Sequence, residues 1–275
     1  MPDRQRTVFF VSDGTGITAE MLGHSLLTQF EGIRFTQSVM PFVDSVEKAA
    51  DCVHQIEAEH ARTGTRPIVF CTLIDDTVRQ RLRQTGALVL DFFEGFLAPL
   101  EGELSTPSSH AVGRSHSAAS NQGYHERIEA VNFSLAHDDG LGDRDLAQAD
   151  IILVGVSRSG KTPTSLYMAL QFGVKAANCP LTPDDFDRGT LPKRIEPLRR
   201  KLYGLTIAPE RLSRIRNERR PDSRYANLEN CRYEVGEAEK LMHKYGIPWI
   251  NSTTKSIEEL ATKIMQEAKV ERRAY

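Results

Sequence analysis

A complete phosphate-binding loop stands in the middle of the chain. The segment 155–162 reads Gly-Val-Ser-Arg-Ser-Gly-Lys-Thr, which fits the pattern G-x-x-x-x-G-K-T. Glycines at its two ends allow the backbone to curl until successive N–H groups point at phosphate oxygens. In such loops the lysine reaches the terminal phosphates and the threonine hydroxyl can bind Mg²⁺. We therefore predict a nucleotide site made of Gly155, Val156, Ser157, Arg158, Ser159, Gly160, Lys161 and Thr162.

The loop has the flanking elements that this chemistry requires. An apolar run at 150–154 has the length of a strand, and a helix is predicted over 161–172. The start of that helix adds the positive end of its dipole to the phosphate site. The plain alternative is a glycine-containing turn between a strand and a helix, with no ligand.

Phosphoryl transfer also needs a carboxylate, which holds Mg²⁺ or accepts the proton of the attacking hydroxyl. Ordinary enzymes with this loop take it from a downstream strand that ends in Asp. Here the downstream strand candidates end near Asn178 and Asn251 instead. The tetrapeptide His-Asp-Asp-Gly at 137–140 lies just upstream, so Asp138 or Asp139 is the nearest candidate. The alternative is a turn with solvated carboxylates.

Three further segments could contact a ligand. Ser-Asp-Gly-Thr-Gly at 12–16 follows a predicted strand, but it lacks the third glycine of a dinucleotide fingerprint, so a tight turn is favoured. Arg114 and His116 could hold a substrate, although a solvated loop is the simpler interpretation. The segment 211–220 with Arg224 is the most basic run, and we expect Leu212 and Ile215 to face inward with the arginines outward. A phosphate clamp or a docking face for an acidic partner is the sharper alternative.

These segments must be positioned by alternating strands and helices. In the first hundred residues we predict strands at 7–11, 34–40, 67–71 and 87–91, with helices at 17–30, 45–62, 75–84 and 92–104. In the second half we predict strands at 150–154, 174–180 and 248–251, with helices at 124–135, 161–172, 209–220, 225–244 and 256–269. The segment 183–204 is punctuated by prolines, and no strand is predicted there.

This alternation predicts an α/β protein with two domains. We expect an N-terminal α/β domain with a parallel, Rossmann-like sheet at 1–104 and a C-terminal domain resembling P-loop kinases at 123–275. The segment 105–122 is rich in serine, glycine, proline and histidine and is predicted to be a linker or mobile loop.

Composition restricts the classes of partner. The 275 residues carry a formal net charge of −2, which gives no global attraction to nucleic acid or to an anionic membrane. The four cysteines are far apart in the sequence, as expected for reduced, buried thiols in a cytoplasmic protein. The sequence does not decide the oligomeric state, and a homo-oligomer remains an open alternative.

The chain resembles the bacterial phosphoenolpyruvate synthase regulatory proteins, which are related to plant pyruvate, phosphate dikinase regulatory proteins. The resemblance extends over nearly the whole chain. It is carried by Ser-Asp-Gly-Thr at 12–15, Leu-Ala-His-Asp-Asp-Gly at 135–140, the loop and its continuation to 165, Tyr-Gly-Leu-Thr-Ile at 203–207, Pro-Glu-Arg-Leu at 209–212, Ser-Arg-Tyr at 223–225 and Ile-Pro-Trp-Ile-Asn-Ser-Thr at 247–253.

The resemblance implies a bifunctional enzyme. One activity would transfer the β-phosphoryl group of ADP to a threonine of the synthase, releasing AMP and inactivating the target. The other would remove it with inorganic phosphate, releasing pyrophosphate. The kinase direction is expected to require a phosphorylated histidine near that threonine. The resemblance further associates Lys161, Thr162 and Asp139 with catalysis. We expect Mg²⁺ to be held by Thr162 and Asp139, and Asp139 to orient or deprotonate the target threonine.

One site could serve both directions, because pyrophosphate is the diphosphate part of ADP without its nucleoside. Two other classes of function stay open. One is an ordinary ATP-dependent kinase, and the other is a non-catalytic nucleotide-sensing module. The target could also be pyruvate, phosphate dikinase rather than phosphoenolpyruvate synthase.

Overall fold

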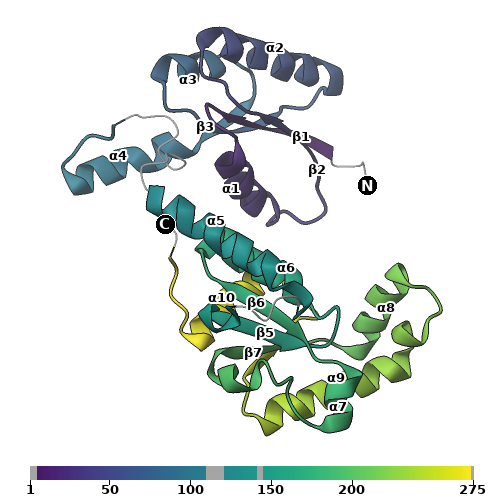
Figure 1. Ribbon diagram of the computed structural model, residues 1–275. Coiled ribbons are helices and arrows are strands. Elements are labelled where there is room, and N and C mark those ends of the chain that lie inside the picture. Colours follow the sequence, from purple (N-terminus) through teal and green to yellow (C-terminus); the bar gives the residue numbers. More distant parts are fainter. Residues whose placement is uncertain (1–4, 110–120, 141–144, 274–275) are drawn as a thin grey trace. The chain divides into compact units, whose positions relative to one another are not determined.

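A computed structural model describes residues 5–109, 121–140 and 145–273 of the chain. The chain divides into two compact units, Met1–Ser117 and Ala118–Tyr275, which are described separately (Figure 1). Most of the segment 105–122, including Arg114 and His116, lies outside the described residues, and its role as a linker stays a prediction. No helix in the described ranges has both the length and the apolar character needed to cross a membrane.

The first unit is a parallel sheet with helices on both faces. Its strands lie in the order β2-β1-β3-β4. The strands are β1 (Gln5–Ser12), β2 (Arg34–Met40), β3 (Ile68–Thr72) and β4 (Leu88–Asp91). The helices are α1 (Ile17–Leu27), α2 (Val46–Thr63), α3 (Asp76–Leu82) and α4 (Phe92–Leu104).

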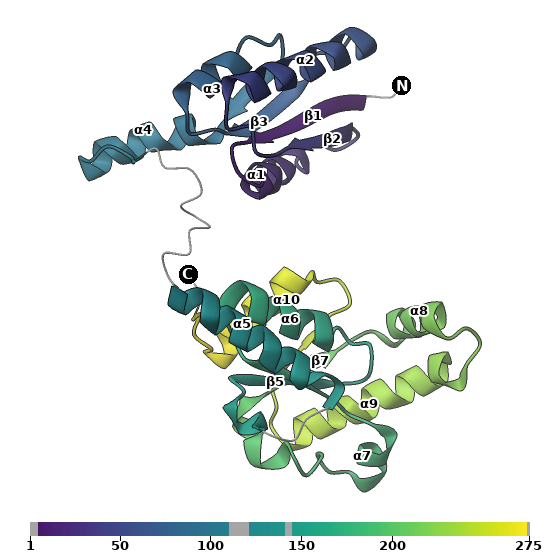
Figure 2. The same cartoon turned by 45° about the horizontal axis from the view of Figure 1, so that its top comes forward.

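Alternate side chains of β1 contribute to the two hydrophobic cores of this unit, one on each face of the sheet. Phe9 and Val11 pack with residues of α2 and α3, whereas Val8 and Phe10 pack on the opposite face with residues of α1. Figure 2 shows these helices on the two sides of the sheet. Because successive side chains of a strand point to opposite faces, a strand that is apolar throughout is buried on both sides.

The second unit repeats this architecture with a second parallel sheet, in the order β6-β5-β7-β8. Its strands are β5 (Ile151–Gly155), β6 (Ala176–Pro180), β7 (Leu202–Thr206) and β8 (Trp249–Asn251). Its helices are α5 (Asn121–Ala136), α6 (Lys161–Phe172), α7 (Pro183–Arg188), α8 (Pro209–Arg219), α9 (Leu228–Lys244) and α10 (Ile257–Ala268). Short 3₁₀ segments are η2 (Asp138–Gly140), η3 (Leu146–Gln148), η4 (Glu196–Lys201) and η5 (Arg224–Ala226).

Two cores flank the second sheet. Ile151 and Leu153 of β5 pack with residues of α6 and α10, whereas Ile152 and Val154 pack with residues of α8 and α9. α8 and the adjacent end of α9 form an arm that projects beyond the sheet (Figures 1 and 2). The predicted α/β class is confirmed, with one parallel sheet in each unit.

Two expectations about the second unit are corrected. The segment 183–204 was expected to contain no strand, but β7 begins at Leu202 and pairs with both β5 and β8. The expected helix at 225–244 begins only at Leu228, after the 3₁₀ turn η5. The side chain of Asn227 caps α9 by accepting hydrogen bonds from two backbone N–H groups, which fixes the start of that helix.

Candidate active site

The loop between β5 and α6 requires its two glycines. Gly155 has φ of 147°, and a Cβ atom there would collide with the carbonyl oxygen of Leu205 on β7. Gly160 has φ of 98° and precedes the first residue of α6. Both values lie where L-residues are strained, so glycine is what allows the loop to curl at the C-terminal edge of the sheet. The helix then starts at Lys161, the predicted residue.

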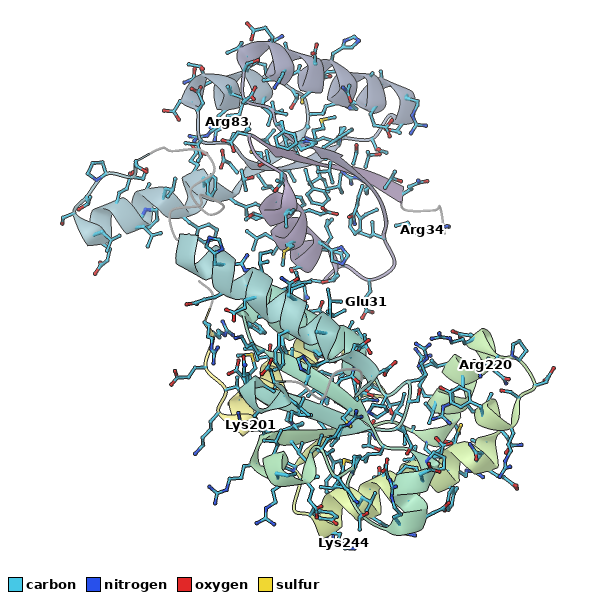
Figure 3. The ribbon with its side chains drawn as sticks, in the orientation of Figure 1. Glu31, Arg34, Arg83, Lys201, Arg220 and Lys244 are labelled. Atoms are coloured by element: carbon cyan, nitrogen blue, oxygen red, sulfur yellow. The ribbon has the colours of Figure 1, made fainter. Side chains whose placement is uncertain are left out.

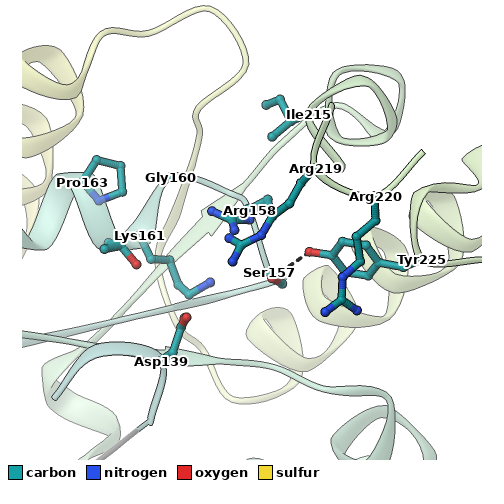
Figure 4. A pocket seen from close by; sticks show the side chains of 11 residues that line it. Asp139, Ser157, Arg158, Gly160, Lys161, Pro163, Ile215, Arg219, Arg220 and Tyr225 are labelled. Atoms are coloured by element: carbon teal, nitrogen blue, oxygen red, sulfur yellow. Dashed lines mark hydrogen bonds between the residues drawn. The ribbon is translucent and has the colours of Figure 1, made fainter. Parts of the chain in front are cut away.

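Lys161 is a buried cation. Its side chain is almost fully enclosed, and Nζ donates a hydrogen bond to the carbonyl oxygen of Val156 at 2.8 Å. Burial lowers the pKa of Lys161 to about 8, opposed by the nearby carboxylates of Asp139 and Asp138. In Figure 4 the ammonium group points toward the Asp139 carboxylate. Negative charge next to this group therefore favours its protonated form.

Asp138 contacts the loop threonine. The hydroxyl of Thr162 donates to Oδ1 of Asp138 at 2.8 Å, and the amide of Asn178 donates to the same oxygen. The same amide also approaches the Thr162 hydroxyl at 3.0 Å. Carboxylate and hydroxyl oxygens are the ligands that Mg²⁺ prefers, so Asp138 and Thr162 together fit such an ion.

Asp139 has a separate position. Its backbone is left-handed, with φ of 47°, and its N–H donates to Oδ1 of Asn178 at 3.2 Å. Its side chain lines the pocket in front of the loop, on the side of Lys161 (Figure 4). Thus the structure brings both upstream carboxylates to the loop, but it places Asp138 beside Thr162 and Asp139 beside Lys161.

Asn178 is the residue that sequence reasoning missed. It lies on β6, beside the P-loop strand β5, and its backbone N–H donates to the carbonyl oxygen of His137 at 3.0 Å. Its side chain bonds to both carboxylate-bearing residues, so it holds the upstream acids where a downstream strand would otherwise supply one. The only sequence signal was an asparagine where a strand was expected to end in Asp.

A pocket of about 480 Å³ opens in front of the loop. Its walls come from the loop, the start of α6, the arm and Asp139 (Figure 4). Three arginines and Lys161 contribute positive charge, against one carboxylate. Figure 3 shows Arg220 in the arm. The lining residues are Asp139, Ser157, Arg158, Gly160, Lys161, Thr162, Pro163, Ile215, Arg219, Arg220 and Tyr225.

The arginines of α8 do not all point outward, which corrects the expectation from the sequence. Arg216 is completely buried and pairs with Glu234 of α9 at 2.7 Å. Its guanidinium also donates to the carbonyl oxygens of Ser157 at 3.1 Å and Tyr225 at 3.0 Å. Arg216 therefore ties the arm to the loop backbone. Leu212 and Ile215 face the core as predicted.

The remaining candidate segment belongs to the first unit and forms a tight turn. The Ser12 hydroxyl accepts a hydrogen bond from the Gly14 N–H at 3.1 Å, and Asp13 accepts one from the Ile74 N–H at 2.8 Å. Gly16 is left-handed and precedes α1. The bond of Ser12 is local, as the favoured interpretation of a tight turn requires, whereas the bond of Asp13 joins this turn to the segment after β3.

Known proteins are similar to this chain over almost its entire length. Residues 8–265 match the family described as kinase/pyrophosphorylase. A protein of Aromatoleum aromaticum named "Putative phosphoenolpyruvate synthase regulatory protein" is 59% identical over 271 residues, or 98% of each chain. Proteins of the same name from Burkholderia mallei and Burkholderia pseudomallei are 59% identical over 269 residues, or 98% of this chain and 99% of theirs. The chain therefore belongs to the kinase/pyrophosphorylase family.

Proposed function

We propose that this protein reversibly phosphorylates a threonine of phosphoenolpyruvate synthase, with ADP as the phosphoryl donor and inorganic phosphate as the acceptor in the reverse reaction. The family supports phosphotransferase chemistry, and the names of the relatives supply the target. One observation carries the proposal further. The buried ammonium of Lys161 and the carboxylate of Asp139 lie beside each other in a pocket whose other charges are positive.

The charge of the pocket suits a diphosphate. Arg158, Arg219 and Arg220 line it together with Lys161, and guanidinium groups bind phosphate oxygens with paired hydrogen bonds. ADP and pyrophosphate share the same diphosphate group. A pocket that holds this group can therefore hold the donor of one reaction and the product of the other.

In the kinase direction, the threonine oxygen attacks the β-phosphorus of ADP. The bond from that phosphorus to the bridging oxygen breaks, AMP leaves, and the hydroxyl proton passes to Asp139. Lys161 stabilises the negative charge of the moving group, and it acts mainly by electrostatics and position. Asp138 with Thr162, in place of the expected Asp139 with Thr162, would hold Mg²⁺, which would neutralise further phosphate charge.

In the reverse direction, an oxygen of inorganic phosphate attacks the phosphorus of phosphothreonine. The bond to the threonine oxygen breaks, that oxygen recovers a proton from Asp139, and pyrophosphate leaves. Lys161 stabilises charge on the same phosphoryl group in both directions. This proposal therefore needs one phosphate site and one proton carrier.

The test uses purified protein, phosphoenolpyruvate synthase, phosphoenolpyruvate and ADP. We expect AMP as the nucleotide product and one phosphorylated threonine in the synthase, seen by mass spectrometry. Release of ADP from ATP would instead indicate an ordinary ATP-dependent kinase. Nucleotide binding without turnover would indicate a sensing module. The same assay with pyruvate, phosphate dikinase decides between the two targets.

A further inference from the structure

The pocket in front of the loop has a second part, formed by α8 and η5. Ile215 of α8 and Tyr225 of η5 line the same cavity as Lys161 at the start of α6. In Figure 4, Lys161 and Asp139 lie together, and the loop residue Ser157 lies between them and Tyr225. An aliphatic side chain and an aromatic ring therefore extend the pocket beyond the group that holds phosphate.

The ring of Tyr225 is held in place from two directions. Its hydroxyl shares a hydrogen bond of 2.9 Å with the hydroxyl of Ser157. The guanidinium of Arg216 lies 4.0 Å from the centre of the ring, and Arg216 is itself fixed by its buried pairing with Glu234. A ring with a fixed orientation loses little conformational entropy when a ligand stacks on it.

Part of the ring remains open to the pocket. The guanidinium of Arg216 covers one face of it from the buried side, whereas Tyr225 is only half-buried and lines the pocket. Ile215 packs partly against the core of the second unit and lines the same pocket. The uncovered part of the ring and the outer part of Ile215 can therefore contact a ligand.

A flat heterocyclic base is the group that these two side chains suit. Every nucleobase has a face that stacks on aromatic side chains, whatever its hydrogen-bonding edge. Inorganic phosphate and pyrophosphate have no such face, and cationic side chains are enough to bind them. The volume of about 480 Å³ lies in the range of pockets that enclose larger organic ligands. A diphosphate at Lys161 thus leaves Ile215 and Tyr225 to the rest of the ligand.

We propose that Tyr225, together with Ile215, forms a subsite for the nucleoside of ADP, and that this subsite serves the phosphorylation direction alone. The proposal rests on the proposed function, because it assigns the part of ADP that pyrophosphate lacks. In phosphorylation, AMP keeps the bridging oxygen and leaves with its base on Tyr225. In phosphorolysis, the attacking phosphate occupies the loop and carries no base. Tyr225 is therefore a specificity-determining residue for one of the two reactions.

The binding experiment uses calorimetry on the full chain with Mg²⁺ and compares ADP with pyrophosphate. Tyr225→Leu removes the ring, whereas Tyr225→Phe keeps it, and both variants lose the hydrogen bond to Ser157. We expect Tyr225→Leu to bind ADP about tenfold more weakly than Tyr225→Phe, because only the ring stacks on the base. The two variants should bind pyrophosphate with affinities within about twofold of each other.

Tyr233→Leu is the matched control, because Tyr233 is exposed on α9 and lies outside the pocket. It should leave both affinities at their native values. Equal losses of ADP affinity in Tyr225→Leu and Tyr225→Phe would overturn the proposal and would leave Tyr225 as a tether of the loop. A loss of pyrophosphate affinity in Tyr225→Leu as large as its loss of ADP affinity would also overturn it.

A second measurement needs no variant and stays informative if Tyr225→Leu does not fold. It compares ADP with ribose 5-diphosphate, which is ADP without its base, on the native chain. We expect ADP to bind about tenfold more tightly. Equal affinities for the two ligands would overturn the subsite.

The kinetic experiment tests the restriction to one direction. Relative to Tyr225→Phe, Tyr225→Leu should raise KM for ADP in phosphorylation about tenfold, with KM for phosphate in dephosphorylation alike in the two variants. A parallel rise of both KM values would overturn the restriction.

Failure of the proposed function gives a different result. A native protein that binds ADP but shows neither transfer from it nor phosphorolysis refutes that function. The two binding comparisons do not depend on turnover, and in that case they still decide the nucleoside subsite.

Discussion

The main electrostatic effect at the loop is on the protonation of Lys161. Burial lowers the pKa of the Lys161 ammonium group because it penalises the charged form. The carboxylates of Asp139 and Asp138 only partly oppose this shift. A bound diphosphate adds several negative charges next to it and should restore the full positive charge. Binding is therefore linked to protonation, and the affinity for ADP should fall as the pH rises above about 8.

Calorimetry checks this linkage. At pH 8, ADP binding should take up roughly half a proton per site, because about half of the free protein then has neutral Lys161. The measured enthalpy should depend on the ionisation enthalpy of the buffer. Lys161→Met, which has a similar volume and no charge, should lose this dependence. An enthalpy that is the same in all buffers would show that Lys161 stays charged in the free protein.

Two single substitutions should distinguish the roles of the two upstream carboxylates. Asp139→Asn should lower the rate of transfer by about 10²–10⁴-fold while ADP still binds, because it removes the proton acceptor. Asp138→Asn should raise the Mg²⁺ concentration needed for half-maximal rate, because Asp138 contacts Thr162. Steady-state rates against Mg²⁺ concentration measure both effects. A reversed pattern would assign the proton carrier to Asp138.

At the level of elements, the sequence predicted most of what positions the loop. α6 runs over the predicted residues, and α10 lies within the predicted range 256–269 and begins with a capping box of Ser256 and Glu259. These features are local, since periodicity and capping depend on residues a few positions apart. Asn178 could not be assigned in this way, because its bonds to Asp138 and Asp139 join residues some forty positions apart.

Two errors have identifiable physical reasons. Arg216 was expected to point into solvent because it is charged. It follows the buried Leu212 by four positions, so it lies on the same helical face and is buried as well. β7 was missed because prolines punctuate the segment 183–204, but the strand begins at Leu202, after the last of them at Pro197. At Gly204, a Cβ atom would clash with the Met242 sulfur and would lie 2.7 Å from the Trp249 Cβ, so the glycine marks close packing of α9 and β8 against β7.

The packing at Gly204 gives a prediction for stability. Gly204→Ala should lower the free energy of unfolding by about 1–3 kcal/mol, because the added methyl group overpacks this contact. Gly236→Ala is the control, since Gly236 lies inside α9 with no atom near its Cβ position. It should raise that free energy by roughly 0.5–1 kcal/mol. Urea unfolding measures both, and equal effects would contradict the packing.

At the level of the whole molecule, the loop and every residue that lines its pocket belong to the second unit. Each unit has its own sheet and its own hydrophobic cores. A separate core is the condition for folding alone. The first unit contributes no described side chain to the pocket, so nucleotide binding should not depend on it.

A truncated chain tests this independence. Residues 118–275 should fold cooperatively and bind ADP with the affinity of the full chain. Circular dichroism during heating and calorimetry with ADP measure the two properties. A folded fragment that no longer binds ADP would show that the first unit completes the site.

The central claim is that one diphosphate site works in both directions, and Lys161→Met tests it most directly. The measurement compares ADP-dependent phosphorylation and phosphate-dependent dephosphorylation of the same target by this variant. Both rates should fall by a similar factor, about 10²-fold or more, because the same ammonium group stabilises the moving phosphoryl group. Dephosphorylation at the native rate, with phosphorylation lost, would contradict the shared site.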